Sequence, residues 1–397
     1  MRSVRWFPTA LVPSGMLAAA LAAVSLLISC GHDRPPQGID TLWTRSIGGL
    51  YSEEAQDVLL TSGGEIIITG TTSTFGAGGF DIYLLRLSAS GDLIWDTTYG
   101  GDRDEQAYAC AALPDGGLAI CGLTNSFGAG AEDVYLLRTT AIGDTVWIRT
   151  YGGTAGDAGY DLAVTADTGL AVAGIKGSDI YLIRTTSSGD TVWTRTFGGA
   201  SNDFATALVP TSDNGYVITG ATSSFGAGSG DVYLFKVDES GNLLWSRTFG
   251  GSQNDWGTAV VEAADHGFLI AGYTESFGNG GYDVYVIRTN DQGDSLWTRT
   301  YGEDGDESGY DVRANLDGTF VICGGTTSYG DAGFDALLLK IDADGEEIWK
   351  AVYGGTEDDI AYALAATADN SYLAAGYSRS WGVGGADVFV LKTVPDP

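Results

Sequence analysis

Acidic residues at one position of a repeated unit are the first feature of this sequence that could do chemistry. Two residues after each acid the side chain is always that of Ala or Gly. These ring acids are Glu53, Glu105, Asp157, Asp203, Asp255, Glu307 and Asp359. If the units close into a ring, the carboxylates surround one mouth of a central channel and could attract Ca²⁺ or another cationic group. We favour the alternative that each accepts hydrogen bonds from the preceding Gly-Gly loop, because a position repeated throughout a fold is more often structural.

Aromatic residues on long, glycine-rich loops form a second candidate group. Each is followed directly by Gly, and the six are Phe75, Phe127, Phe225, Phe277, Tyr329 and Trp381. Such rings could stack on a sugar or on a partner protein. We expect instead that they fold back and cover the apolar ends between the sheets, because the position recurs so regularly.

Two further polar positions recur in all seven units. The first is an Asp that opens the third predicted strand and is expected to cap its turn: Asp81, Asp133, Asp179, Asp231, Asp283, Asp335 and Asp387. The second is a cation five residues later: Arg86, Arg138, Arg184, Lys236, Arg288, Lys340 and Lys392. In a hairpin that turns near Gly91, Arg86 and Trp95 become cross-strand neighbours. We therefore predict that the cation lies on the indole face, a contact worth about 1 kcal/mol.

The remaining chemical candidates leave alternatives open. Cys110 and Cys121 flank a predicted turn and could form a disulfide or stay as two buried thiols, whereas Cys323 is expected to be a small core residue. Acidic runs at 303–307 and 342–346 are expected to be solvated turns and not Ca²⁺ loops. No pair of carboxylates differs from the other units in a way that marks a hydrolase.

The first thirty residues predict export. Arg2 and Arg5 precede a run without charge that ends at Cys30, as in a secretory signal. The sequence Leu27–Cys30 resembles the lipobox of bacterial lipoproteins, which implies that Cys30 carries acyl chains. Residues 1–29 are then the signal peptide and 30–40 the lipidated Cys with its tether. By analogy Gly31 after the Cys favours the outer membrane. An ordinary cleaved signal or an uncleaved anchor remain alternatives.

Composition excludes several functions. Lys and Arg number 20 against 51 Asp and Glu, so the formal net charge is −31. A nucleic acid or an anionic headgroup needs a basic face, so neither is an expected partner, and the membrane is reached only through the lipid anchor. His32 and His266 are the only histidines, too few for a His-rich zinc site or a His-based triad. We expect no resident cofactor.

Tryptophan marks an internal repeat that must position all these residues. The spacings between Trp43, Trp95, Trp147, Trp193, Trp245, Trp297 and Trp349 are 52, 52, 46, 52, 52 and 52 residues. Each unit holds four strand-like segments, which in the second unit are Ala107–Leu113, Leu118–Leu123, Asp133–Thr139 and Thr145–Tyr151. This pattern predicts an all-β fold, a seven-bladed β-propeller with four antiparallel strands per blade, over residues 41–397.

The two chain ends predict how the ring closes. The seventh unit stops after its third strand, and the first Trp strand precedes any complete blade. Pairing Thr41–Ile47 beside Asp387–Thr393 completes one blade from both ends and leaves neither edge open.

The repeat also resembles known families. Its YGG-x3-[DE]-x-[AG] segment, followed by D-x-G-[YF]-x-[IVL]-x-G, is similar to the seven-bladed propeller repeat of bacterial surface proteins. A looser likeness, through G-D-x-x-W as in Gly91–Trp95, is to the tryptophan-docking repeat of quinoprotein propellers. The adjacent cysteine pair of those enzymes is missing, so the second resemblance implies architecture and not quinone chemistry.

These observations predict an exported, lipid-anchored, monomeric propeller that acts as a non-catalytic protein-binding scaffold at the cell envelope. One alternative is a carbohydrate-binding propeller whose aromatic loops hold a glycan. Another is an envelope enzyme, a hydrolase or a cofactor-dependent oxidoreductase, with a site at a blade junction. Such a site is expected to break the repeat, and the third and sixth units depart from it most.

Overall fold

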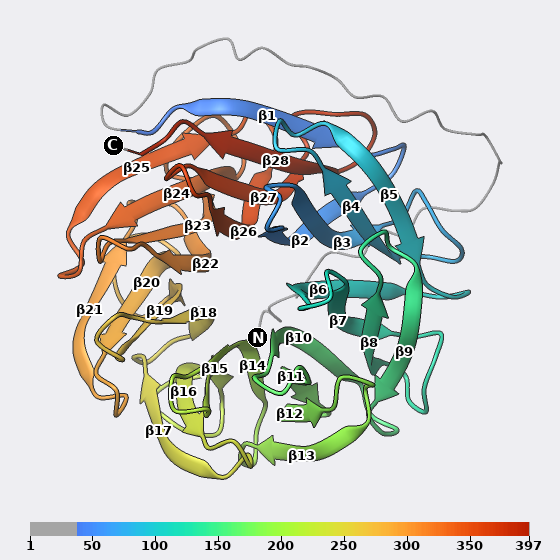
Figure 1. Cartoon of the computed structure of the whole chain (residues 1–397). Coiled ribbons are helices and arrows are strands. Elements are labelled where there is room, and N and C mark those ends of the chain that lie inside the picture. The colour runs from blue at the N-terminus through green and yellow to red at the C-terminus, as the bar shows by residue number, and fades with distance from the viewer. Residues whose placement is uncertain (1–37, 397) are drawn as a thin grey trace.

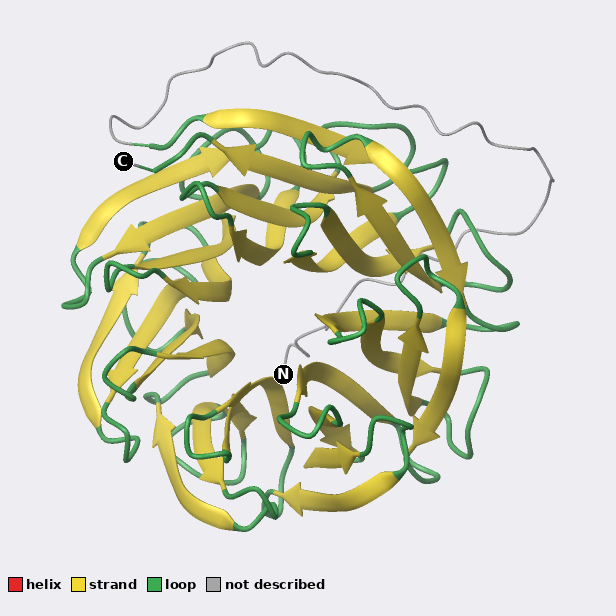
Figure 2. Cartoon of the chain, in the orientation of Figure 1, coloured by secondary structure: helices red, strands yellow, loops and turns green. Residues whose placement is uncertain are grey.

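The computed structural model describes residues 38–396, which form 28 strands in seven four-stranded antiparallel sheets. The sheets surround an axis like the blades of a propeller, as Figure 1 and Figure 2 show. The predicted seven-bladed fold is therefore confirmed. None of the residues from 38 to 396 forms a helix with the length and apolar character that crossing a membrane requires.

Each sheet runs from an inner strand beside the axis to an outer strand at the rim. The inner strands are β2 (Glu53–Leu60), β6 (Glu105–Ala112), β10 (Asp157–Val164), β14 (Asp203–Pro210), β18 (Asp255–Glu262), β22 (Glu307–Ala314) and β26 (Asp359–Ala366). The second strands are β3 (Ile66–Thr72), β7 (Leu118–Thr124), β11 (Leu170–Lys176), β15 (Tyr216–Thr222), β19 (Phe268–Thr274), β23 (Phe320–Thr326) and β27 (Tyr372–Ser378).

The third and outer strands complete the blades. The third strands are β4 (Asp81–Leu87), β8 (Asp133–Thr139), β12 (Asp179–Thr185), β16 (Asp231–Val237), β20 (Asp283–Thr289), β24 (Asp335–Ile341) and β28 (Asp387–Thr393). The outer strands are β5 (Leu93–Tyr99), β9 (Thr145–Tyr151), β13 (Thr191–Phe197), β17 (Leu243–Phe249), β21 (Ser295–Tyr301), β25 (Glu347–Tyr353) and β1 (Thr41–Ile47). In the second blade the predicted strands match these bounds to within two residues.

Burial explains why the sequence forms these strands. The second and third strands, such as β3 and β8, are almost continuously buried, because both faces of each sheet pack on neighbouring blades. The core consequently lies between blades: Ile68 and Leu85 of the first blade share one cluster with Leu373 and Val390 of the seventh. Outer strands such as β9 are largely uncovered, and even Val146 and Ile148 are exposed there.

The second strand of each blade contains a glycine that allows the adjacent inner strand to bulge. At Gly70 a Cβ atom would lie 1.9 Å from the carbonyl oxygen of Glu54, a distance that no side chain tolerates. The register of β2 on β3 shifts between Ala55 and Asp57, directly beside this glycine. The bulge in the inner strand therefore depends on the Gly of the repeat. It changes the direction in which the following inner-strand side chains point beside the axis.

The ring closes as the chain ends predict. In the sheet of the seventh blade β1 pairs antiparallel with β28, in the order β1-β28-β27-β26. Thr44 lies opposite Leu391 and Ile47 opposite Val388. Both strands thus gain a partner, and the first and last parts of the chain hold the ring together (Figure 1).

The C-terminal tail, residues 394–396, replaces a turn that the seventh blade lacks. In other blades the outer-strand indole donates to a backbone carbonyl of the next blade's turn, as in Trp147 to Ser187, Trp193 to Glu239 and Trp297 to Ala343. In the sixth blade Trp349 Nε1 instead donates to Asp396 Oδ1 (3.1 Å). The buried Asp396 also accepts from Lys340 Nζ (2.5 Å) and from the Tyr372 hydroxyl (3.1 Å).

The recurring cation does not lie on the indole, so that prediction is wrong. Arg86 and Trp95 are cross-strand partners as expected, but the Arg86 guanidinium pairs with Glu65 in the hairpin turn of its own blade. The same arrangement holds for Arg138–Asp115, Arg184–Asp167, Lys236–Asp213, Arg288–Asp265, Lys340–Asp317 and Lys392–Asp369. A carboxylate within reach is a stronger partner than a ring face.

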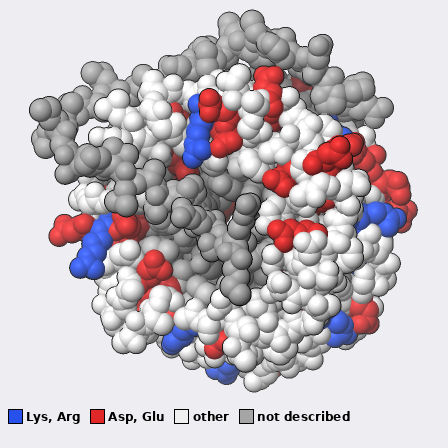
Figure 3. Space-filling view, turned by 180° about the vertical axis from the view of Figure 1, so that it is seen from behind, with Lys and Arg blue, Asp and Glu red and all other residues white. Residues whose placement is uncertain are grey.

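A different arginine occupies the indole face. In five blades the residue two positions after the Trp lies over the ring at 5.2–5.8 Å: Arg45, Arg149, Arg195, Arg247 and Arg299. On the face drawn in Figure 3 most basic side chains lie beside acidic ones, and acidic patches are the more numerous. The basic residues are thus used within the fold and form no basic patch there.

The structure also bears on the cysteines, for which a disulfide or buried thiols were the alternatives. Cys110, Cys121 and Cys323 are buried and free, because Cys121 lies opposite Ala109 and not opposite Cys110. Burial raises the pKa of all three thiols well above its usual range. Cys30, the predicted signal peptide and residues 30–37 of the predicted tether lie outside the described residues.

The tail contacts yield a stability prediction. Asp396→Ala removes the carboxylate that pairs with buried Lys340 and accepts from Trp349, so it leaves a buried charge without its nearest partner. We expect the free energy of unfolding, measured by urea denaturation, to fall by about 3 kcal/mol.

The control uses the same lysine. Asp317 lies 3.8 Å from Lys340 Nζ and is mostly exposed. Asp317→Ala should therefore cost less than about 1 kcal/mol. Equal losses for the two variants would contradict the role assigned to the tail.

Candidate functional site

The ring acids lie inside the ends of the sheets. Each is at most 1% exposed. In the second blade Glu105 accepts hydrogen bonds from the Gly101 N–H (2.6 Å), the Thr124 hydroxyl (2.6 Å) and the Ser126 N–H (3.0 Å). The Gly-Gly loop, or its equivalent, donates to the other six in the same way. The carboxylates thus follow the structural alternative, and each holds its own loop.

Every ring acid is paired with the Asp that opens the third strand of the preceding blade. At the first junction a Cβ atom on Gly100 would lie 1.8 Å from Asp81 Oδ1 and 2.8 Å from Glu105 Oε2, so only glycine fits between the two carboxylates. Burial, together with the neighbouring acids, raises the pKa of Asp81 to about 6. The same causes raise the pKa of Asp335 and Asp387 to about 7.

The loop aromatics pack onto their own blades. Phe75, Phe127, Phe225, Phe277 and Trp381 have ring centroids 5.4–6.2 Å from an aromatic ring of the third strand. Tyr329 instead bonds Glu303 (3.1 Å) and Lys350 (3.0 Å) through its hydroxyl. The rings therefore cover the apolar ends of the sheets, although Phe127, Phe225 and Phe277 keep over 40% of their surface exposed.

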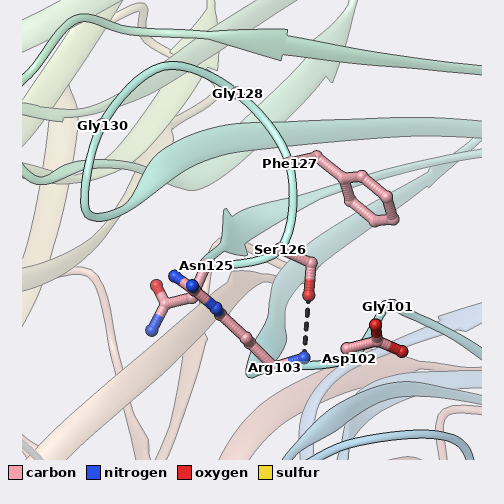
Figure 4. A pocket seen from close by; sticks show the side chains of 8 residues that line it. All are labelled: Gly101, Asp102, Arg103, Asn125, Ser126, Phe127, Gly128 and Gly130. Carbon is pink, nitrogen blue, oxygen red and sulfur yellow. Dashed lines mark hydrogen bonds between the residues drawn. The ribbon is translucent and has the colours of Figure 1, made fainter.

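A surface pocket of about 430 Å³ lies between the loops that join β5 to β6 and β7 to β8 (Figure 4). Ser126 Oγ accepts a hydrogen bond from the Arg103 N–H (3.0 Å), which ties the two loops together. The Arg103 and Asn125 side chains lie on one side of Ser126, and the Phe127 ring points to the other (Figure 4). The charged and aromatic groups therefore do not converge on one small ligand.

The blades differ most along the axial wall, which we define as the first, third and fourth residues after each ring acid. The first residues are Glu54, Gln106, Ala158, Phe204, Trp256, Ser308 and Ile360. The third are Gln56, Tyr108, Tyr160, Thr206, Thr258, Tyr310 and Tyr362. The inner strands that carry these unlike residues surround the axis (Figure 1). Of the first residues, Ala158, Trp256, Ser308 and Ile360 are buried, and Glu54, Gln106 and Phe204 are partly exposed. Unlike residues at one position of a repeat are expected of a recognition site and not of a purely structural repeat.

One part of the wall is an aromatic arc that crosses the fourth to seventh blades. Its members are Phe204, Trp256, Tyr273, Tyr310, Tyr362 and Tyr377. Successive centroids lie 5.0, 6.2, 6.5, 5.0 and 5.9 Å apart, within the range of favourable ring contacts. The first blade places Glu54 and Gln56 at the corresponding positions. A second aromatic pair, Tyr108 and Tyr160, lies at 5.0 Å in the second and third blades. The polar residues of the first blade therefore separate two aromatic stretches of the wall.

Three carboxylates and one guanidinium also lie on the inner strands, in the first, third and sixth blades. The fourth residues after the ring acid are Asp57, Asp161 and Asp311 in three blades and Ala in the other four. Each Asp accepts from its own next N–H and from an N–H of the neighbouring inner strand, at Cys110 (2.8 Å), Leu208 (2.7 Å) or Leu364 (2.9 Å). Asp311 also pairs with Arg313 (2.8 Å). These residues tie adjacent blades together beside the axis.

Burial controls the titration of these three acids. It raises the pKa of Asp57 to about 6 and that of Asp161 to about 7, against the lowering effect of their backbone hydrogen bonds. It also raises the pKa of Asp311, although the Arg313 charge lowers it. The wall therefore changes charge near neutral pH.

The sequence analysis missed the axial wall, although a signal for it is present. Between a constant acid and a constant small residue, the intervening residue ranges from Glu54 to Trp256 and Ile360. A position that varies between fixed neighbours in an internal repeat is released from the structural demand that fixes the others. Attention to the repeated positions hid the variable ones.

Metal ligation finds little support in this geometry. Within residues 38–396 no three His, Cys, Asp or Glu side chains are grouped as ligands for one ion. The acidic run at 303–307 has Glu303 and Asp304 exposed, as solvated turns are. The carboxylate oxygens of the ring acids already accept hydrogen bonds from loop N–H and hydroxyl groups.

No protein-family model matches the chain. A curated relative, the regulatory protein FlaEY of Caulobacter vibrioides, is 26% identical over 296 residues. That match covers 70% of this chain and 27% of FlaEY, so the chain spans about a quarter of the relative.

Solved propellers resemble this fold at low identity. BBS1N, in its complex with ARL6DN, has a TM-score of 0.56 and 12% identity, with 90% of this chain and 98% of that chain covered. The Pan2 WD40 domain of Neurospora crassa has a TM-score of 0.54 and 10% identity, with 86% and 90% covered. At these identities the likeness shows a shared seven-bladed, WD40-like architecture and nothing of a ligand.

Carboxyls with raised pKa values predict that mild acid stabilises the protein. The Asp161 pKa is about 7 in the folded state and about 4 in the unfolded chain, so between these values the folded state binds more protons and its stability rises as pH falls. Asp57, Asp335 and Asp387 act in the same direction. Asp213, with a pKa of about 2, loses its stabilising contribution only below about pH 4. We expect the Tm from circular dichroism to rise between about pH 8 and about pH 5.

Two variants test the origin of that rise. Asp161→Asn removes one titrating group, so its Tm should depend less on pH, whereas Glu239→Gln, on an exposed turn, should keep the wild-type dependence. A wild-type Tm that falls over this range contradicts the assigned protonation.

Proposed function

We propose that this protein is an exported, lipid-anchored, non-catalytic protein-binding scaffold of the bacterial cell envelope. The observation that carries the proposal is the axial wall, where the seven blades differ while the other recurring polar positions serve the fold. A binding surface needs unlike side chains on a rigid frame, and here the inner strands supply both.

The fold supports a protein partner. Propellers of this architecture commonly serve as protein-binding scaffolds, and BBS1N is a related fold solved in complex with another protein, ARL6DN. An aromatic surface with a polar border is also typical of the core of a protein interface. The loop aromatics, on which a glycan-binding role depends, contact a ring of their own blade in all cases but Tyr329, as Phe127 and Phe225 do, which favours a covering role over a glycan site.

The paired carboxylates support binding and not catalysis. They recur at every junction, and the ring acid of each pair, such as Glu105, is occupied by loop donors. A hydrolase needs one pair set apart with room for a substrate. The proposal therefore includes no resident metal or cofactor.

The proposed location of the protein in the cell envelope is based on its N-terminal sequence. Leu27–Cys30 resembles a lipobox, and Gly31 after the Cys is the analogy that favours the outer membrane. Gly38 and Ile39 lead from the tether to β1, and Tyr353 donates to the Ile39 carbonyl (2.6 Å). An anchor at Cys30 would thus hold the propeller at its rim, away from the axial wall.

Lipidation can be tested directly. We expect wild-type protein expressed in a bacterial host to incorporate labelled palmitate and to enter the detergent phase, and Cys30→Ser to do neither. Cys323→Ser, which alters a buried thiol, should keep the label. Palmitate on the Cys30→Ser variant contradicts the anchor assignment.

Partner binding can be tested with a photocrosslinker. We expect p-benzoylphenylalanine at Gln106, on the axial wall, to give a discrete protein adduct in native cells. The same group at Thr194, exposed on the outer strand β13, should give none. Adducts from Thr194 alone would place the interface at the rim and overturn the assignment to the axis.

A further inference from the structure

Glu54 is the acidic residue among the first residues of the axial wall. It follows ring acid Glu53 on β2 and is half-buried. Within residues 38–396 no hydrogen-bond donor contacts its carboxylate. Burial raises its pKa, while the charge of Arg379 lowers it. A carboxylate that is partly removed from water and accepts no hydrogen bond within the fold gains free energy from a cation that reaches it.

Arg379, the cation nearest in effect to Glu54, already forms other interactions. Arg379 pairs with Asp358 (2.9 Å) and lies over the Tyr377 ring at 5.4 Å. It therefore influences Glu54 through space but forms no ion pair with it. Within residues 38–396 the Glu54 carboxylate therefore has no ion-pair partner, and a second positive group could pair with it.

The aromatic arc ends beside Glu54. The strand β2, which carries Glu54, packs directly against β26 and β27, which carry Tyr362 and Tyr377, and the Glu53 N–H donates to the Ala386 carbonyl (2.8 Å). Glu54 therefore lies at the blade junction where the arc ends. Tyr310 follows Tyr362 at 5.0 Å, so the arc leads away from the carboxylate along the wall. Aromatic faces attract cations and also pack against aliphatic chains.

The negative charge of the wall and of the whole chain favours a positively charged partner. Along the wall Asp57, Asp161 and Asp311 face a single Arg313. The whole chain carries −31, so an anionic partner is repelled before it arrives. A lysine or arginine side chain fits such a wall, because its charged head can pair with the carboxylate while its aliphatic stem packs against the rings.

We propose that the axial wall binds a lysine or arginine side chain of an extended segment of the partner protein, with Glu54 accepting hydrogen bonds from its cationic head and Tyr362 and Tyr310 packing along its stem. This inference rests on the proposed scaffold function, for which it supplies the chemistry of the partner.

The test uses fluorescein-labelled pentalysine and the full-length protein in detergent at physiological ionic strength. We expect saturable binding by fluorescence anisotropy, and no binding of labelled pentaglutamate. Glu54→Gln should weaken pentalysine binding about tenfold, as expected for loss of a charge-assisted hydrogen bond. Tyr362→Leu should weaken it as well, and a Tm close to wild type confirms that each variant is folded.

The matched control removes an equal charge elsewhere. Glu239 lies on an exposed turn at the opposite end of the strands from the ring acids, and Glu239→Gln should leave pentalysine binding unchanged. Equal losses for Glu239→Gln and Glu54→Gln show attraction to the acidic surface as a whole and overturn the inference, as does no binding to wild type.

The outcomes separate this inference from the scaffold proposal. If crosslinking at Gln106 gives an adduct but pentalysine does not compete with it, the scaffold stands and the cationic partner is wrong. If pentalysine binds in a Glu54-dependent way but Gln106 gives no adduct, the cation site stands and the protein partner fails.

Discussion

The covering of sheet faces and edges is the constraint on which this structure depends. A four-stranded blade with two apolar faces is stable only between two neighbours, so the blades must form a ring. The clusters that join Ile68 and Leu85 to Leu373 and Val390 show the first blade packed on the last. Pairing of β1 with β28 then gives both chain ends a partner strand. Each outer strand keeps one open edge.

The same constraint decides which residues repeat. Each junction needs a loop held against its blade, and the ring acid provides this by accepting N–H and hydroxyl donors at a position where water is excluded. Gly100 and its equivalents follow from the pair of carboxylates that meets there, since a Cβ atom would strike both. Residues fixed by such demands recur in every blade, and positions without them are free to differ. Recognition is therefore expected where the repeat is broken, which is the axial wall.

Sequence reasoning predicted the fold because its signals are local and periodic. Trp spacing, turn glycines and the incomplete seventh unit were sufficient for the blade count and for the closure by Thr41–Ile47. The contact of Arg86 with the indole was wrong because the register alone does not reveal Glu65, a carboxylate that arrives from a separate turn. The aromatic arc was missed because its members come from separate blades and meet only around the axis.

Closure also creates the site proposed for a cationic side chain. Glu54 belongs to the first blade, whereas Tyr362, Tyr377 and Arg379 belong to the seventh, and the sequence between them is the rest of the propeller. The backbone N–H of Glu53 donates to the Ala386 carbonyl (2.8 Å), so the two blades are joined directly beside Glu54. A carboxylate from one end of the chain thus meets rings from the other end only in the closed ring. The interaction that makes the fold possible is in this way also the one that brings the candidate recognition residues together.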